Sequence, residues 1–581
     1  MGPVPLSAAL PPFLFPPFPS QFLLSTPFRT GIDAAPGIGI TYPNLMQVSR
    51  PLPSLAAIIA AIAIAIPAHR AEARFVLPQD IATEAPIKET ISKLLAVKSS
   101  KDAEPFFASL KSAADAGSAD ALFAVAYLYQ TGIGVEASAE KAKEAYQQAA
   151  TKGSAAAKNN LGLLRLGLGE NPKDAVATIE TAATAGYSPA QVSMGQLFLD
   201  GLPAAGIAKD LDQARVWFER ASDAGDSDAS LTLGVMYEQG AGVTADQSEA
   251  VRLMERAVDA GNPSAMIRLG TKLAAGQGIK PNPEKGRALF DKAITANAQG
   301  ARSALAALYE SGTGFAKDEK KAFELYSKAA EEGDATAWNK LGYFHENGMG
   351  VPKSDAKALE WYKKGADQNV PVCIHNLAVF TEEGRGGLTK DSKAAFALFY
   401  KAALSAFVPS QLALAIRYRD GKGVTADPQA AMAWCERAMQ NGNIDASVQF
   451  AIMLESGAAG IVNLETAAKI YEEAANKGHP GAMVQLAGLL ETGRGVPGDF
   501  RKSFALYQIA SKAGFKPATE KLDALRRKLT PDQLKAAEAF AAGTTASTKP
   551  ADPAADPATK PAPAPAPAPA KKPAATKPKA R

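Results

Sequence analysis

The chain has 581 residues, a formal net charge of +4 and two cysteines. Seven basic and two acidic residues fall within residues 541–581, so this C-terminal segment carries +5 and the remainder is close to neutral. Because a nucleic-acid-binding body needs a basic face of its own, we expect no nucleic-acid partner. Two cysteines are too few for a disulfide framework or a tetrahedral metal site. Cys373 and Cys435 therefore form either one bridge or two separate buried thiols.

Residues 46–73 have the order of a secretory signal peptide, with a basic residue, an apolar run and a small-x-small cleavage pattern. Arg50 precedes the apolar run Ser54–Ile66, and Ala71-Glu72-Ala73 follows it. The run is too short for a transmembrane helix, which needs about 20 apolar residues, although an Ala-rich buried helix would have the same composition. We predict cleavage after Ala73 and a periplasmic or secreted protein.

Residues 1–45 are rich in Pro and Phe and show no helical period. They place the signal peptide far from the start of the chain. We therefore interpret them as an upstream segment that precedes the true start at Met46.

Residues 74–117 are predicted to form a linker and an N-terminal capping helix. Phe106–Ala116 has the apolar spacing that recurs in the second helices of the repeats after it, but no partner helix before it. A cap is needed because the terminal unit of a repeat array would otherwise expose its apolar face.

A glycine turn, Gly-x-Gly followed by an apolar residue, recurs along residues 118–514. From Gly240 to Gly493 it returns at intervals of 36, 36, 36, 36, 37, 36 and 36 residues. A constant period of this length indicates a solenoid, in which each unit packs only on its neighbours. The turns begin at Gly132, Gly240, Gly276, Gly312, Gly348, Gly421 and Gly493, with looser versions at Gly167, Gly201, Gly384 and Gly457.

One unit illustrates why each repeat is a helical hairpin. Ala335–Asn347 has apolar or small residues at helical spacing and predicts a first helix, which ends at Gly348. Ser354 or Asp355 can cap a second helix, which is predicted over Ala356–Asp367. The fold predicted from these units is all-α.

Four columns of residues recur at fixed places in the hairpins. Two small columns on the second helix let neighbouring backbones approach closely, while a bulky column on that helix and a leucine column on the first helix fill the remaining space. The first small column is Ala142, Ala175, Ala214, Ala250, Gly286, Ala322, Ala358, Ala395, Ala431, Ala467 and Ser503. The second is Ala149, Ala182, Ala221, Ala257, Ala293, Ala329, Gly365, Ala402, Ala438, Ala474 and Ala510. The bulky column is Tyr146, Ile179, Phe218, Met254, Phe290, Tyr326, Tyr362, Phe399, Cys435, Tyr471 and Tyr507. The leucine column is Leu161, Leu233, Leu269, Leu305, Leu341, Leu377, Leu414 and Leu486.

The segment Leu233–Val243, with the sequence Leu-Gly-Val-Met-Tyr-Glu-Gln-Gly-Ala-Gly-Val, resembles the first half of a Sel1-like repeat, a longer-looped relative of the tetratricopeptide repeat. The resemblance covers about eleven units of about 36 residues over 118–514. The resemblance implies a right-handed α-α superhelix. It also implies a function as an adaptor or regulator, because this family contains more adaptors and regulators than enzymes. Cysteine-rich exported members of the family carry a Cys pair in each unit, which this chain lacks.

The C-terminal end of the array has its own predicted cap. Over 515–541 we expect two capping helices, Ala518–Leu529 and Leu534–Ala541, with Thr530 at the start of the second. Residues 542–581 contain Ala, Pro, Lys and Thr without bulky apolar side chains, and are predicted to be disordered. This basic tail either keeps the protein soluble or makes a weak contact with an anionic cell-wall or membrane surface.

Catalytic and cofactor motifs are absent from the sequence, which contains neither Gly-x-x-x-x-Gly-Lys-Ser/Thr nor His-Glu-x-x-His. His345 takes the place of Tyr237 and Tyr309 in other units and is interpreted as a packed aromatic side chain. We predict a protein that is not an enzyme and that has no cofactor and no metal site.

A recurrent carboxylate is the candidate partner-binding feature. Glutamate stands five residues after the leucine column in most units, and these residues would form a charged row suited to a basic or polar peptide if the first helices line the concave face. The alternative is an ordinary solvent-exposed position near a helix end. The candidate partner-binding residues are Glu238, Glu310, Glu346, Glu382, Glu455 and Glu491, together with Asn339, Tyr343 and His375 on first helices.

We therefore predict a non-catalytic scaffold, adaptor or regulator of the cell envelope that binds a protein or peptide on its concave face. Two alternatives are an envelope structural protein that binds cell wall through its basic tail and a wall-modifying hydrolase built on the repeats.

Overall fold

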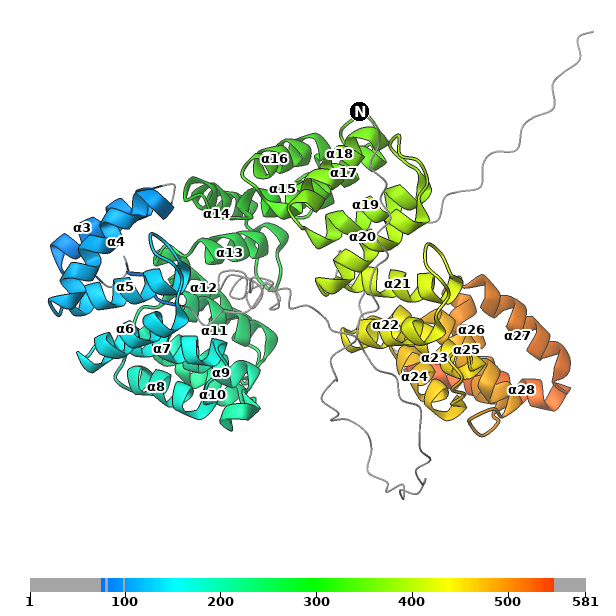
Figure 1. The fold of residues 1–581 in the computed structure, drawn as a ribbon. Helices are drawn as coiled ribbons and strands as arrows, with labels where there is room; N and C mark the ends of the chain where they lie inside the picture. The colour runs from blue at the N-terminus through cyan, green and yellow to red at the C-terminus, as the bar shows by residue number, and fades with distance from the viewer. Residues whose placement is uncertain (1–74, 79–81, 98–99, 548–581) are drawn as a thin grey trace, which may run out of the picture. The chain divides into compact units, whose positions relative to one another are not determined.

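The structure, a computed structural model, describes residues 75–78, 82–97 and 100–547. These residues form 26 α-helices and one short 3-10 helix, and the only β-type pairing among them is an isolated bridge between Leu202 and Ile207 (Figure 1). The helices are α3 (Ala85–Ala96), α4 (Ser100–Asp115), α5 (Ala119–Thr131), α6 (Ala139–Thr151), α7 (Ala155–Gly167), α8 (Pro172–Thr184), α9 (Ser188–Asp200), α10 (Leu211–Asp223), α11 (Ser227–Gln239), α12 (Gln247–Asp259), α13 (Pro263–Ala275), α14 (Pro283–Thr295), α15 (Ala301–Ser311), α16 (Glu319–Glu331), α17 (Ala335–Asn347), α18 (Asp355–Asp367), α19 (Pro371–Glu383), α20 (Ser392–Leu404), α21 (Val408–Asp420), α22 (Pro428–Gln440), α23 (Ile444–Ser456), α24 (Leu464–Asn476), α25 (Pro480–Thr492), α26 (Phe500–Lys512), α27 (Lys516–Lys528) and α28 (Pro531–Ser547).

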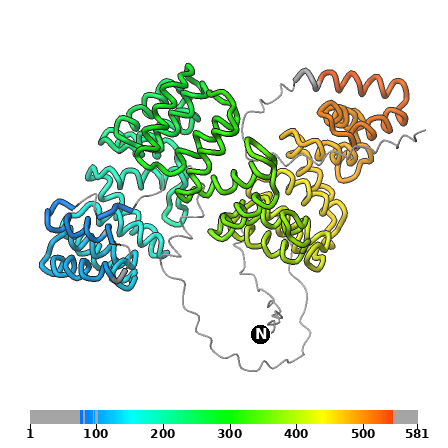
Figure 2. The backbone as a smooth tube through the Cα atoms, turned by 90° about the horizontal axis from the view of Figure 1, so that it is seen from above, coloured from blue at the N-terminus to red at the C-terminus, as the bar shows by residue number. Residues whose placement is uncertain are grey.

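The helices from α5 to α26 pair in chain order into eleven hairpins, and each hairpin packs on the ones before and after it (Figure 2). The prediction of an all-α repeat superhelix is confirmed. Because contacts run between sequence neighbours, each hairpin completes its apolar core with residues of the adjacent hairpins.

The hairpin loop has the conformation that its glycines predict. Gly348 ends α17 in the left-handed conformation, with φ of 74°, and Ser354 caps α18 by accepting the N–H of Lys357 at 3.3 Å. Gly350 has φ of 65°, and a Cβ there would lie 2.6 Å from the carbonyl carbon of Glu319 in the preceding hairpin. The second glycine is therefore required for contact between hairpins as well as for the turn.

The predicted columns lie in the core. Every member of the two small columns and of the bulky column is buried. Gly365 replaces alanine in the second small column because the Sγ atom of Cys373 occupies the space of its missing Cβ. Leu377 is the member of the leucine column that is only partly buried.

The two cysteines are separate buried thiols. Burial raises the pKa of Cys373 to about 12 and that of Cys435 to about 11, the latter against the opposing charge of Arg419. Both side chains pack as small apolar residues.

Two irregular connections interrupt the period. The link from α7 to α8 is short, since α7 ends at Gly167 and α8 begins at Pro172. The link from α9 to α10 is long and folds back on itself through the bridge between Leu202 and Ile207, which encloses the 3-10 helix Pro203–Ala205. Ile207 is buried in the core of the α7–α10 region.

The predicted N-terminal cap needs correction. A helix over Phe106–Ala116 without a preceding partner was expected, but α4 begins at Ser100, contains Pro105 and packs on an additional helix, α3. Ile87, Ile91 and Leu94 form the buried stripe of α3. Their spacing of four and three residues is that of an amphipathic helix.

The C-terminal cap is present as α27 and α28, and its predicted end needs correction. Thr530 and Gln533 form a reciprocal capping box, in which the N–H of Gln533 donates to the Thr530 hydroxyl at 3.3 Å and the N–H of Thr530 donates to the Gln533 side chain at 3.0 Å. The helix α28 continues to Ser547, six residues beyond the predicted end at Ala541. The predicted tail over 542–581 therefore begins too early.

Several predictions fall outside the described residues: the upstream segment 1–45, the start at Met46, the signal peptide 46–73 and the tail after Ser547. Within the part of the chain that the structure describes, no helix has the length and apolar character needed to cross a membrane.

Candidate functional site

The glutamate row, defined as Glu238, Glu310, Glu346, Glu382, Glu455 and Glu491, has the same local position throughout. Each member lies two residues before the left-handed glycine that ends a first helix. The row therefore stands where the first helix, the hairpin loop and the next hairpin meet.

Buried tyrosines of the bulky column donate to four members of the row. The acceptor is always 16 residues before the tyrosine. The hydroxyl-to-carboxylate distances are 2.7 Å for Tyr326 to Glu310, 2.8 Å for Tyr362 to Glu346, 3.1 Å for Tyr471 to Glu455 and 3.5 Å for Tyr507 to Glu491. Burial, and then the charge of the partner carboxylate, raises the pKa of each of these phenols, so each stays protonated as a donor.

A tyrosine in the bulky column always has an acceptor at the row position, although glutamate also stands there in the hairpins whose bulky residue is Met254 or Phe399. Tyr146 in the first hairpin donates to Gln130, which takes the glutamate position, at 2.9 Å. In the fifth hairpin the bulky residue is Phe290, which has no hydroxyl, and the row position is Ala274. A buried hydroxyl requires an acceptor, whereas a phenyl ring does not.

Each carboxylate of the row also pairs with a cation from the following element. The cationic partners lie in the next hairpin or, for Glu491, in α27. The distances are 2.7 Å from Arg268 and 2.6 Å from Lys272 to Glu238, 3.0 Å from Lys340 to Glu310, 2.6 Å from Arg385 to Glu346, 2.5 Å from Arg417 and 3.2 Å from Lys422 to Glu382, 3.4 Å from Arg494 to Glu455 and 2.6 Å from Lys528 to Glu491.

Arg385 shows how one cation holds two parts of a neighbouring hairpin. It follows Gly384 at the end of α19 and donates to Glu346 at the end of α17. Its other nitrogens donate to both oxygens of Asp355, the first residue of α18, at 3.0 and 2.9 Å. These hydrogen bonds from Arg385 lower the pKa of Asp355. The guanidinium thus fixes both ends of the α17–α18 loop.

Arg417 and Glu382 form the most enclosed pair of the row. Their side chains are 10% and 11% exposed. The Arg417 guanidinium carbon lies 3.7 Å from the centre of the Phe399 ring, and burial lowers the pKa of Arg417 despite the nearby carboxylate. Removing one partner would leave a charge in an apolar setting.

The side chains of the row are 11–24% exposed, and each carboxylate has a cation beside it. The arrangement joins successive hairpins. A role of the row in partner binding remains a prediction, and a basic peptide would have to compete with these intramolecular cations.

The other three candidate residues have different surroundings. Asn339 accepts a hydrogen bond from Asn376 of the next hairpin at 2.8 Å. Tyr343 is 44% exposed, and the Lys340 ammonium lies 5.9 Å from its ring centre. His375 is enclosed, with its Nδ1 atom 2.8 Å from the Ser410 hydroxyl. Of the three, Tyr343 is the side chain most accessible to a partner.

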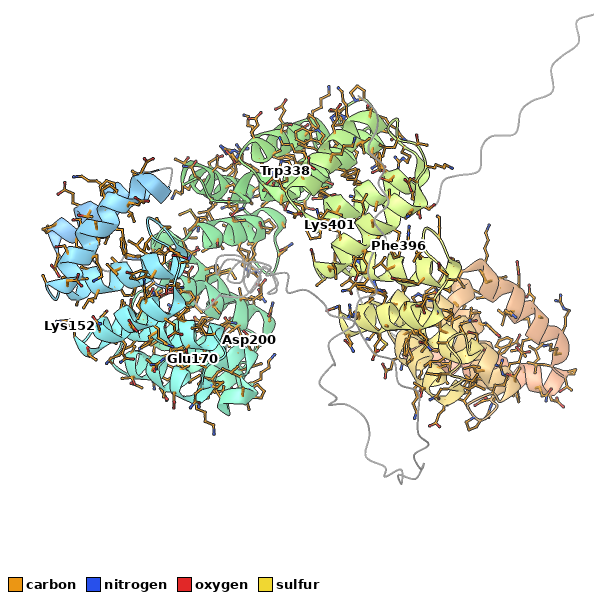
Figure 3. All side chains as sticks on the ribbon, viewed as in Figure 1. Lys152, Glu170, Asp200, Trp338, Phe396 and Lys401 are labelled. Atoms are coloured by element: carbon orange, nitrogen blue, oxygen red, sulfur yellow. The ribbon has the colours of Figure 1, made fainter. Side chains whose placement is uncertain are left out.

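Other side chains that join hairpins are visible in Figure 3. Trp338 of α17 donates its indole N–H to the carbonyl of Ala330 in α16 at 3.2 Å. Glu170, in the short α7–α8 link, accepts from Lys143 of α6 at 2.7 Å. His345 contacts Phe323 edge to face with ring centres 5.4 Å apart, which confirms its interpretation as a packed aromatic side chain.

A second feature, Asn160 of α7, holds the main chain of Val76. The Asn160 carboxamide accepts the N–H of Val76 and donates to the carbonyl of Val76, both at 2.9 Å. One residue presents its N–H and C=O to the same side only when the chain is extended. Asn160 has 0% exposure and Val76 has 7%. The Asn160 amide also donates to the Tyr146 hydroxyl at 3.3 Å and accepts from Asn159 at 3.3 Å, which fixes its orientation.

Neither the cations of the row nor Asn160 was predicted from the sequence. The cations lie at unequal separations of 30 to 40 residues after the row glutamates, so no fixed spacing marks them in the sequence. The role of Asn160 depends on where a segment 84 residues earlier returns, and local spacing carries no such signal.

Replacing Tyr326 by Phe should lower the free energy of unfolding by about 1.5 kcal/mol, because the hydrogen bond to the Glu310 carboxylate is lost in a buried setting. Urea denaturation measures the effect. Tyr343→Phe is the matched control, since this ring is partly exposed, and it should change stability by less than about 0.5 kcal/mol. Equal effects of the two substitutions would contradict the assignment.

The burial of His375 predicts a stability that depends on pH. Burial, and then the charge of Arg417, lowers its pKa to about 4 from 6.5. Between these values the unfolded chain binds the proton and the folded chain does not, so stability is full above pH 6.5 and falls toward pH 4 by about 3 kcal/mol. Urea denaturation at about pH 7.5 and about pH 4.5 should show this decrease. In His375→Gln, the loss of unfolding free energy between the two pH values should be smaller by the contribution of His375. An equal loss in the variant and the wild type would contradict the prediction.

Among the described residues, no group of three His, Cys, Asp or Glu side chains is placed to hold a metal ion. The polar groups at the row and at Asn160 are arranged as ion pairs and hydrogen bonds between hairpins.

The sequence profile of the Sel1 repeat family matches ten segments that together cover more than half of the chain, at residues 119–154, 188–226, 227–262, 263–297, 300–334, 337–370, 371–406, 408–443, 449–479 and 480–515. The chain belongs to the Sel1 repeat family. Among the eleven hairpins, the one without a match is α7–α8, which has the short link.

Solved structures similar to this Sel1 repeat protein include a protective antigen of uropathogenic Escherichia coli that displays an SLR fold. The two sequences are 27% identical, the match covers 78% of this chain and 99% of that chain, and the TM-score is 0.44. A Sel1 repeat protein from Oxalobacter formigenes has 24% identity, with 67% and 98% covered and a TM-score of 0.38. An immunity protein from Pseudomonas aeruginosa has 19% identity, with 39% and 88% covered and a TM-score of 0.30. A search of the curated proteins found no match.

Proposed function

We propose that this chain is a non-catalytic scaffold of the cell envelope, periplasmic or secreted, that binds a partner protein or peptide on the surface formed by its first helices. Sel1 repeat proteins generally mediate protein–protein interaction, and the Sel1 solenoid is typically non-catalytic. The envelope location rests on the predicted signal peptide at residues 46–73.

The observation that carries the proposal is the contact between Asn160 and Val76. A side chain on a first helix holds an extended main chain through both its N–H and its C=O. Hydrogen bonds to the main chain do not depend on the bound sequence, which suits a surface that binds a peptide. The surface is therefore able to bind an extended segment.

Affinity capture followed by cross-linking and mass spectrometry tests the proposal. We expect a captured protein to cross-link to first helices, and we expect Tyr343→Ala combined with Asn339→Ala to weaken capture. Lys363→Ala on the second helix α18 is the matched control, because Lys363 is exposed and outside the candidate surface. Cross-links confined to second helices, or equal loss with both variants, would contradict the proposal.

Removing the tail from residue 548 onward distinguishes the alternative in which the basic tail binds cell wall. The proposal predicts that the shortened protein captures the same partner. If removing the tail abolishes capture, the alternative is favoured.

A further inference from the structure

The segment around Val76 fills a built site. Val76 is 7% exposed, Pro78 is buried, and Phe75 packs against the apolar cores of both the α3–α7 and the α7–α10 regions. Asn160, which holds the Val76 main chain, is fully buried. The site thus combines a fixed carboxamide with apolar contacts on each side.

The polar network behind Asn160 extends across three hairpins. Asn159 donates to Asn160 at 3.3 Å and accepts from the Ser193 hydroxyl of α9 at 2.9 Å. Tyr146 of α6 contributes its hydroxyl to the same network. Because α6, α7 and α9 all contribute, the site belongs to the repeat array, and residues 75–77 occupy it as an added extended segment.

A separate contact tethers this segment to the array. The carboxylate of Asp120, near the start of α5, accepts the N–H groups of Thr83 and Glu84 at 2.6 and 3.1 Å and the Thr83 hydroxyl at 3.0 Å. This anchor does not involve Asn160. The Val76 contact can therefore open while α3 stays attached.

We propose that residues 75–77 are a tethered ligand in a peptide-binding site centred on Asn160, and that an extended peptide with an aromatic and a branched apolar residue takes this site when they leave it. This inference rests on the proposed function. It adds the class of peptide that binds and the segment, residues 75–77, that blocks its binding. The tether gives residues 75–77 a high effective concentration, on the order of millimolar, so they mask the site against weak ligands.

The test uses a fluorescein-labelled peptide, Phe-Val-Leu-Pro flanked by glycines, and variants of the full chain. Val76→Pro removes the N–H that Asn160 accepts. The variant should bind the peptide about tenfold more tightly than the wild type, because the tethered competitor is weakened. Val76→Ala keeps the main-chain N–H but loses apolar contact, so its affinity for the peptide should lie between those of the wild type and Val76→Pro. Fluorescence anisotropy measures each dissociation constant.

Adding Asn160→Leu to Val76→Pro should abolish peptide binding, with unchanged circular dichroism showing that the array is folded. Equal affinity of the wild type and Val76→Pro, or peptide binding that survives Asn160→Leu, would overturn the proposal. If the double variant unfolds, hydrogen exchange in the wild type decides. The Val76 amide should be protected, and competing peptide should remove that protection.

The same exchange experiment at two protein concentrations tests whether the segment binds within one molecule. Protection that does not change with concentration supports the tethered ligand. Protection that rises with concentration would show exchange of the segment between copies and would overturn it. Peptide binding as described with no captured partner would contradict the proposed function while leaving this site intact.

Discussion

Replacing Ala322 by Trp should destabilise the protein by about 3 kcal/mol, because overpacking a filled core forces backbones apart. Ala322 belongs to the first small column and is 0% exposed. At the same position one hairpin earlier, Gly286 is so close to α13 that a Cβ would lie 2.7 Å from the carbonyl oxygen of Gly270. Hydrogen exchange should show loss of protection in α15–α18 together, since each hairpin packs on its neighbours.

Glu324→Trp is the matched control for this experiment. Glu324 is exposed on the same helix, α16, so the same side chain enters without entering the core. Its effect should stay within about 0.5 kcal/mol. Wild-type stability of Ala322→Trp would contradict the packing of the small columns.

Reversing three charges of the glutamate row together, with Glu346, Glu382 and Glu455 changed to Lys, should lower the free energy of unfolding by about 4 kcal/mol. Each lysine would face a guanidinium, that of Arg385, Arg417 or Arg494, which now pairs with a carboxylate. Two of the three positions would also lose the acceptor of a buried tyrosine hydroxyl. Urea denaturation measures the total effect.

The control makes the same change in formal charge at Glu324, Glu360 and Glu473, which are exposed on second helices. It should have a small effect, about 1 kcal/mol or less in sum. If both triple variants are equally stable, the row does not join the hairpins. The comparison is also needed to interpret partner capture. If the row variant loses capture, its stability shows whether the array has been destabilised or the partner contact has been lost.

The repeat hairpins could be predicted closely from the sequence because the relevant interactions are local. The helix predicted over Ala335–Asn347 has the bounds of α17. Its glycine stop and the small columns depend on residues a few positions apart, and these patterns recur in every unit. The additional helix α3 was missed because its stripe of Ile87, Ile91 and Leu94 belongs to no repeat.

The candidate site could be predicted only in part. The positions of the row glutamates follow from the repeat, but their cations do not, because Arg385 follows a glycine turn whereas Lys340 lies within a helix. The fixed spacing of 16 residues from Glu310 to Tyr326 is the signal that the sequence contains for this arrangement. The contact between Asn160 and Val76 joins an unrelated segment to a repeat and has no periodic signal.

The central claim is that the glutamate row connects successive hairpins through ion pairs. A double-mutant cycle on Glu382 and Arg417 tests it most directly, since this is the most enclosed pair of the row. With Glu382→Gln and Arg417→Met, singly and together, urea denaturation should give a coupling free energy of about 2 kcal/mol. Strictly additive effects of the two substitutions would contradict the claim.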